Sequence, residues 1–65
     1  MTDVETKLLE ILNQFGGEAS LFLITNPDSP WAALGDTASL EAAVKSLAGQ
    51  GVISLDESDG SVKVK

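Results

Sequence analysis

The segment that most constrains the fold is the run at residues 47–53, which reads Leu-Ala-Gly-Gln-Gly-Val-Ile. Apolar residues before it recur at i, i+4 and i+7, which places them on one face of a helix: Leu40, Val44 and Leu47. Gly51 then occupies the position after the helix end, because glycine reaches positive φ at low cost. With Gly51 at this position, Val52 is expected to contact Leu47, as in a Schellman motif. The sequence therefore predicts a helix that stops before Gly51 and continues directly into a strand.

After this junction, apolar and polar residues alternate in two short runs separated by a loop at residues 57–60. Alternation with a period of two predicts strands that have one buried and one solvated face. The loop sets the apolar side chains opposite one another in two pairs, Leu55 with Val62 and Ile53 with Val64. A shift of one residue would expose the apolar set of one strand, so burial selects this register. An isolated hairpin is marginal in water, so we expect it to pack on the helices.

Residues 2–17 predict the first helix. Thr2 and Glu5 have the spacing of a capping box, and the acidic residues of the first turn suit the positive end of the helix dipole. Gly16-Gly17 ends the helix. An apolar stripe runs along one face, and we expect it to face the core. Its members are Val4, Leu8, Ile11, Leu12 and Phe15.

Residues 18–36 are the least constrained part of the chain. Residues 20–25 are apolar without a clear period, so a buried strand and a short helix capped by Ser20 both remain open. We favour a brief extended entry at residues 18–19 followed by one or two helical turns. Asn26-Pro27 ends this element, because the residue before proline avoids the helical region.

A further short helix is predicted to start at Ser29-Pro30 and to close at Gly35. It contains Trp31, the only tryptophan of the chain. Trp31 has two interpretations: a core or lid residue, or an exposed anchor for a partner. The next helix is then capped by Asp36 or Thr37.

Two stretches carry a resemblance to a known family. In residues 39–53 a leucine-rich helix end meets a glycine and then aliphatic residues, and residues 8–12 precede the pair Gly16-Gly17. Both stretches resemble the winged-helix family, at its passage from the third helix into the wing and at its first helix. The resemblance implies an α+β, winged-helix-like domain over residues 1–65, with three helices followed by a C-terminal two-stranded β-hairpin. Segment 18–36 departs from the compact second helix of the family.

The resemblance also implies DNA binding, with the third helix in the major groove and the wing on the backbone. The outward positions of that helix would be Ser39, Glu41, Ala42, Lys45, Ser46 and Gly49. Only Lys45 among them is basic, the wing tip is acidic, and the formal net charge is −6 with no arginine. Affinity for duplex DNA comes largely from cations on phosphates, and arginine is the usual reader of guanine. A DNA-binding transcriptional regulator is therefore the alternative function, disfavoured by charge.

A protein-docking role is the favoured function. The outer face of the third helix is small at Ala42, Ser46 and Gly49, which lets another surface approach the backbone. A plain solvated helix is the other interpretation of this stripe. We predict a non-catalytic protein-interaction or regulatory module that binds a protein partner or a second copy. The predicted partner-binding residues are Trp31, Glu41, Ala42, Lys45, Ser46 and Gly49.

The residue types argue against catalysis and cofactor binding. The chain has no histidine, cysteine or tyrosine, so no imidazole is available to activate its serines. The acidic run 56–59 lacks the length and closing glutamate of an EF-hand, and Gly16-Gly17 lacks the Lys-Ser/Thr of a phosphate-binding loop. We therefore expect no enzyme activity, catalytic residue, metal or cofactor. No apolar run reaches membrane-spanning length and no signal-peptide pattern is present, so we expect no membrane association and a cytoplasmic location.

Overall fold

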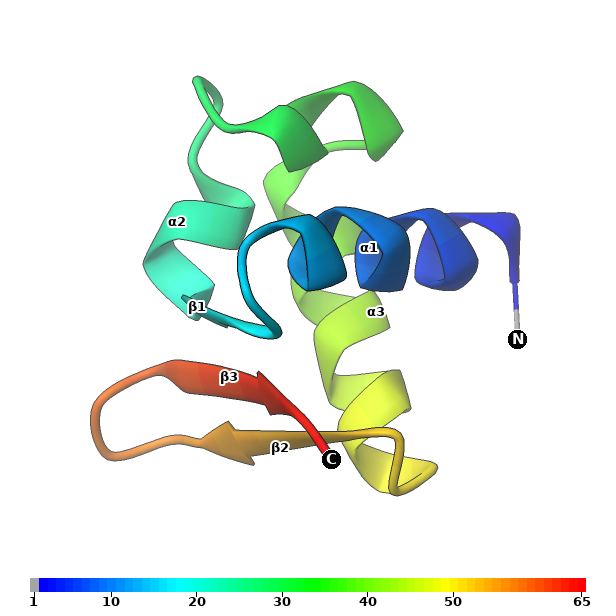
Figure 1. Ribbon diagram of the computed structural model, residues 1–65. Helices are drawn as coiled ribbons and strands as arrows, with labels where there is room; N and C mark the ends of the chain where they lie inside the picture. Colours follow the sequence, from blue (N-terminus) through cyan, green and yellow to red (C-terminus); the bar gives the residue numbers. More distant parts are fainter. Residues whose placement is uncertain (1) are drawn as a thin grey trace.

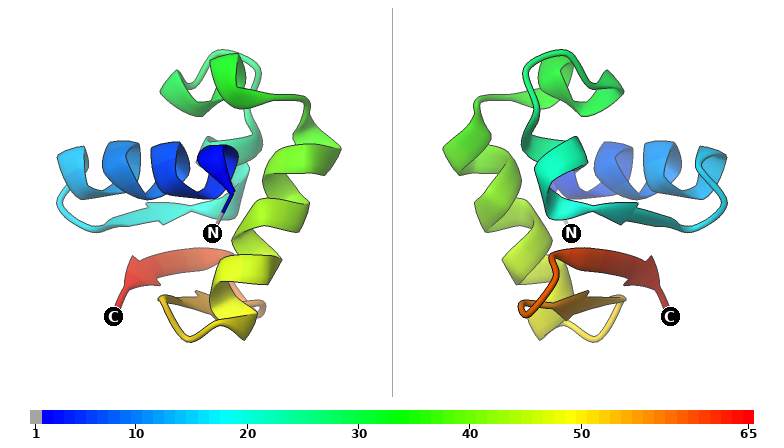
Figure 2. Two further views of the ribbon diagram at one scale, coloured as in Figure 1. Left: turned by 90° about the vertical axis from the view of Figure 1, so that its right-hand side faces the viewer. Right: turned by 90° about the vertical axis from the view of Figure 1, so that its left-hand side faces the viewer.

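The computed structural model describes residues 2–65. These residues form a small α+β domain with the predicted order of helices followed by a hairpin (Figure 1). The 3₁₀-helix η1 lies at one end of the molecule, the hairpin lies at the other, and α3 runs between them (Figures 1 and 2). The elements are α1 (Asp3–Gln14), β1 (Glu18–Ser20), α2 (Leu21–Thr25), η1 (Pro30–Leu34), α3 (Thr37–Gly49), β2 (Ile53–Asp56) and β3 (Ser61–Val64).

The capping box of α1 is confirmed. Thr2 Oγ1 accepts a hydrogen bond from the Glu5 N–H at 3.2 Å, and Glu5 Oε1 accepts one from the Thr2 N–H at 3.2 Å. The helix ends at Gln14, before the predicted limit of 17, because Gly16 and Gly17 have φ of 83° and 85°. The Gly17 N–H donates to the Leu12 carbonyl at 3.0 Å, which satisfies one of the free carbonyls at the helix end.

The predicted junction between α3 and β2 is confirmed in detail. Asp36 caps the helix, its Oδ1 accepting from the Ser39 N–H at 2.8 Å. Gly51 has φ of 79°, and the Val52 N–H donates to the Leu47 carbonyl at 3.1 Å. This bond, from the second residue after the helix end to a carbonyl of the last helical turn, defines the Schellman motif. It accompanies a reversal of the chain, which turns back along the helix.

The hairpin has the predicted register, with Ile53 opposite Val64 and Leu55 opposite Val62. The sheet, however, has three strands in the order β1-β3-β2, so the predicted two-stranded hairpin was incomplete. The extended entry at residues 18–19 is confirmed as β1, which pairs antiparallel with β3 and sets Ala19 opposite Val62. This pairing covers the edge of β3 that would otherwise present unpaired backbone groups.

The middle segment resolves in favour of the short helix. Ser20 caps α2, its Oγ accepting from the Leu23 N–H at 3.0 Å, and Asn26 ends it. Pro30 begins η1 as predicted, but the Ser29 hydroxyl donates to the Ile24 carbonyl at 3.2 Å instead of capping the helix. No helix formed by residues 2–65 has the length and apolar character needed to cross a bilayer.

The core lies between the helices and the inner face of the sheet. Its buried side chains come from α1, α2, η1, α3 and both strands of the hairpin, so each of these elements is held by the same cluster. They are Leu8, Leu12, Ile24, Trp31, Leu40, Ala43, Val44, Leu47, Ile53 and Val62.

Candidate interaction surface

Trp31 belongs to the core. Its exposed fraction is 0%, and its Nε1–H donates to the Leu8 carbonyl at 3.1 Å. Phe15 covers the indole from outside, with ring centroids 5.0 Å apart and an interplanar angle of 42°. The core interpretation of Trp31 is therefore confirmed, and its assignment as an exposed partner anchor is wrong. A buried indole with a satisfied N–H contributes packing and offers no surface to a partner.

The outward residues of α3 divide into two sets. Glu41, Ala42 and Lys45 line one exposed depression together with Ala38. Lys45 Nζ lies 3.1 Å from Glu41 Oε1, which makes an i,i+4 surface pair on the helix. Three of the predicted partner-binding residues are thus neighbours on one open face.

Ser46 is engaged in a contact with α1. Its hydroxyl donates to Glu5 Oε2 at 3.3 Å and accepts from Gln50 Nε2 at 3.1 Å. Gly49 is exposed, and nothing lies within 4 Å of the position a Cβ would take there. The residues of the predicted small stripe, Ala42, Ser46 and Gly49, are all exposed, and the hydroxyl of Ser46 is in addition bonded to Glu5 of the neighbouring helix.

The partner of Ser46 in this contact, Glu5, is a buried carboxylate with an exposed fraction of 6%. Its Oε1 accepts from both the N–H and the hydroxyl of Thr2, and its Oε2 accepts from Gln50 Nε2 at 2.8 Å. Hydrogen bonds from Thr2, with smaller contributions from Gln50 and Ser46, hold the pKa of Glu5 below its ordinary value near 4.5 despite desolvation. The sequence predicted that Glu5 caps α1. It did not predict the hydrogen bonds that Glu5 accepts from Ser46 and Gln50, which lie 41 and 45 positions away in the chain.

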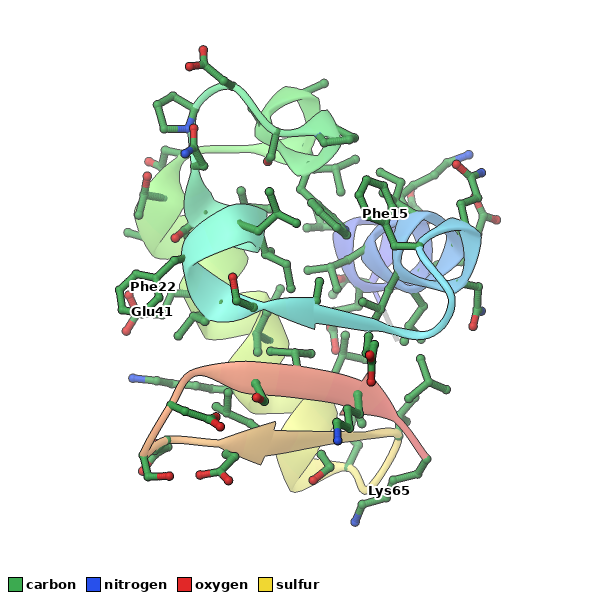
Figure 3. All side chains as sticks on the ribbon, turned by 60° about the vertical axis from the view of Figure 1, so that its left-hand side comes forward. Phe15, Phe22, Glu41 and Lys65 are labelled. Carbon is green, nitrogen blue, oxygen red and sulfur yellow. The ribbon has the colours of Figure 1, made fainter. Side chains whose placement is uncertain are left out.

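The most exposed large apolar side chain among the described residues is Phe22, at 78%. It lies on α2 beside a groove of about 310 Å³ that α2, α3 and the loop between β2 and β3 enclose. Leu21 and Leu55 form the rest of its apolar wall. Figure 3 shows the Phe22 side chain next to that of Glu41, well away from Phe15.

Gly60 lies where the hairpin loop meets α2, and its positive φ favours glycine at this position. It has φ of 76°, and a Cβ built on it would stand 3.5 Å from Phe22 Cε2. Its carbonyl accepts from the Leu21 N–H at 2.7 Å, and its own N–H donates to the Asp56 carbonyl at 2.8 Å. The hairpin tip is therefore tied to the start of α2, and one side of the Phe22 ring rests near the glycine.

The rim of the groove is predominantly acidic. Glu41, Glu57 and Asp59 line it with one cation, Lys45, which is already paired with Glu41. Hydrogen bonds from the side chain and backbone of Ser61, aided by the charge of Lys63, lower the pKa of Asp59 below its ordinary value. Asp59 is therefore ionised throughout the neutral range.

Phe22 was not among the predicted site residues, because the sequence indicates the limits of the short helix but not which of its sides faces the core. A helix of five residues can turn only one side toward a core, and Ser20 and Asn26-Pro27 bound such a helix. With Ile24 buried and Leu21 half-buried, the side chains of Phe22 and Leu23 must point outward.

Among residues 2–65 no group of three or more histidine, cysteine, aspartate or glutamate side chains is placed to hold a metal ion. The rim carboxylates stand at exposed positions around an aromatic ring, which suits recognition of a ligand by contact and charge.

Comparison with known proteins adds no relative from which a role could be transferred. No family model, no curated protein and no solved structure matches this chain.

Proposed function

We propose that this chain is a non-catalytic protein-interaction or regulatory module that docks through the groove between α2, α3 and the hairpin tip. The observation that carries the proposal is the 78% exposure of Phe22 beside that groove. Large exposed apolar side chains that border a concave site are typical of protein contacts.

The energetics of a small domain support this role. Leaving a phenylalanine in water forgoes about 1.5–3 kcal/mol of burial. A domain of this size rarely gains more than about 3–5 kcal/mol from its core. A partner that covers the Phe22 ring would therefore gain a free energy comparable with a sizeable part of what the core contributes.

The proposal keeps part of the surface predicted from the sequence. Glu41 and Lys45 line the Phe22 groove, and Ala42 lies next to both of them on α3. Trp31 leaves the set because it is buried. Ser46 faces α1, and Gly49 follows it toward the end of the helix, so neither contributes to this groove.

Regulation through duplex DNA, the function that the winged-helix resemblance implies, remains the second candidate and has weaker support. The exposed middle of α3 carries Lys45, whose charge Glu41 compensates at 3.1 Å. The hairpin tip, which would meet phosphates, carries Asp56, Glu57 and Asp59. Phosphate contacts require uncompensated cations, and these two elements supply carboxylates.

Site-specific photocrosslinking tests the docking role. A benzophenone amino acid replaces Phe22 in the full chain expressed in its own cells, and the matched control carries the same group at Phe15. We expect a crosslinked protein that is specific to position 22 and that binds the purified wild-type chain. Crosslinks of equal pattern at both positions would contradict the proposal. So would shifts of α3 and hairpin amides on adding duplex DNA that disappear with salt, since they would favour the second candidate.

A further inference from the structure

The groove combines an apolar wall with an acidic rim, and this combination points to the chemistry of its occupant. We propose that the occupant is a short basic and apolar segment of a partner protein, which places a leucine- or phenylalanine-like side chain on Phe22 and an arginine or lysine against the rim carboxylates. This inference rests on the proposed docking function and names the class of partner.

The apolar part of the argument is the size and lining of the groove. Its volume of about 310 Å³ lies at the small end of ligand sites, which range over ~300–1,000 Å³. Leu21, Phe22 and Leu55 provide the apolar contact, and the ring of Phe22 is open on the side away from Gly60. A site of this size accepts one or two side chains of an extended or helical segment.

The electrostatic part is the uneven balance of charge around that wall. Three carboxylates stand on the rim, and the one cation among them is held by Glu41. An added cation would meet Glu57, together with Asp59, on which the charge of Lys63 already acts. Phe22 lines the same groove, and the face of an aromatic ring attracts cations. Arginine fits best, because its guanidinium both pairs with carboxylates and stacks on rings.

A second copy of this chain is a poorer occupant. Each copy carries a net charge of −6, so two copies repel each other at long range.

Peptide display tests the inference. A library of random 12-residue peptides is selected on the immobilised full chain, and selected peptides are resynthesised and titrated against purified variants. We expect enrichment of arginine or lysine next to leucine or phenylalanine. Affinity should fall about tenfold in Phe22→Ser, as for a contact at the centre of a site. It should also fall severalfold in the double variant Glu41→Gln/Glu57→Gln, and binding should weaken with salt.

The matched control is Glu10→Gln/Glu18→Gln. Both double variants remove two negative charges, and each also breaks one surface ion pair, Lys45–Glu41 in the groove and Lys7–Glu10 on α1. We expect the control to bind within about twofold of wild type. Thermal unfolding of all variants confirms that each is folded before it is titrated.

The outcomes separate this inference from the proposed function. Two outcomes would overturn the basic partner but not the docking role. One is selected peptides that require Phe22 but lack cations. The other is an equal loss of affinity in the two double variants. A dimer in sedimentation that Phe22→Ser dissolves would replace the partner segment by a second copy. Selected peptides that bind Phe22→Ser as well as wild type would overturn both.

Discussion

Two aromatic side chains from the same middle segment have opposite fates in this molecule. Trp31 is buried between α1 and α3 with its N–H bonded to Leu8, whereas Phe22 lies 78% exposed at the groove between α2 and the hairpin tip. Polar groups follow the same division, since the buried Glu5 is surrounded by donors and the carboxylate of Glu57 stands in solvent. On the Trp31 side of the domain, the apolar ring and the polar groups have their partners within the chain. On the Phe22 side, an apolar ring and charged groups are exposed and available to a partner.

This difference shows how to recognise a docking surface in a small domain. In a small domain with few apolar residues, most large apolar side chains are expected in the core. Phe22 departs from that expectation at a site whose rim carries three carboxylates and one lysine. The difference predicts that changes on the Trp31 side alter stability, whereas changes on the Phe22 side alter binding.

The largest effect is expected for Trp31→Ala. Truncating a fully buried aromatic costs about 3–5 kcal/mol, which is comparable with the whole stability of a domain of this size. We expect a largely unfolded chain at 25 °C by circular dichroism. Trp31→Phe keeps much of the ring volume and should give a folded chain of lower stability. A native melting curve for Trp31→Ala would remove the distinction between the two faces.

The next effect concerns the two glycines near the end of α3. Gly51→Ala places a side chain at φ of 79°, where no neighbour lies within 4 Å, so the cost of about 1–2 kcal/mol is purely conformational. Gly49→Ala lies within the helix with equal space and is the matched control. It should stabilise the fold by about 0.5–1 kcal/mol. Urea unfolding measures the change in the free energy of unfolding for both variants. A change of the same sign in the two variants would contradict the Schellman motif at the end of α3.

Acid should destabilise the protein through carboxylates whose pKa values are lowered in the fold. Hydrogen bonds from Thr2 depress the pKa of Glu5, and hydrogen bonds from Ser39 depress that of Asp36. A depressed pKa contributes stability that is present above the unfolded value and is lost as pH falls through the folded value. Stability should therefore be flat near neutrality and fall below about pH 4.5. The variant Glu5→Gln should be less stable at pH 7 and should lose less stability on acidification.

Urea midpoints of wild type and Glu5→Gln at pH 7 and at pH 3 measure this effect. The control is Glu10→Gln, because Glu10 is an exposed residue paired only with Lys7 on the surface. Parallel pH curves for wild type and Glu5→Gln would show that the link between α1 and α3 contributes no pH-dependent stability.

The smallest effect on stability is expected for Phe22→Ser. The ring is mostly in water, so its removal should change the free energy of unfolding by about 0.5 kcal/mol or less. Thermal unfolding at matched concentration measures this change. A loss of stability comparable with that of Trp31→Ala would show that Phe22 supports the fold as Trp31 does. It would contradict the difference between the two sides of the domain.

Local sequence signals predicted most of the fold. The capping box at Thr2 and Glu5, the caps at Ser20 and Asp36 and the Schellman junction at Gly51 each depend on residues a few positions apart. The hairpin register follows from the alternation of its two strands about a short loop. The candidate site was predicted only in part, because Glu41 and Lys45 line the groove while Trp31 and Ser46 are engaged elsewhere. Amphipathic spacing indicates which side of a helix is apolar but not which neighbour it meets.

The sequence by itself determined where the chain caps and turns, because those hydrogen bonds join residues only a few positions apart and need no distant partner. It also determined the hairpin register, because a shift of one residue would expose the apolar side chains of one strand. The tertiary structure alone decided three features: the pairing of β1 with β3, the bond from Glu5 to Gln50, and the choice of Phe22 over Trp31 as the exposed ring. Each depends on how segments far apart in the chain share a core too small to bury every apolar side chain.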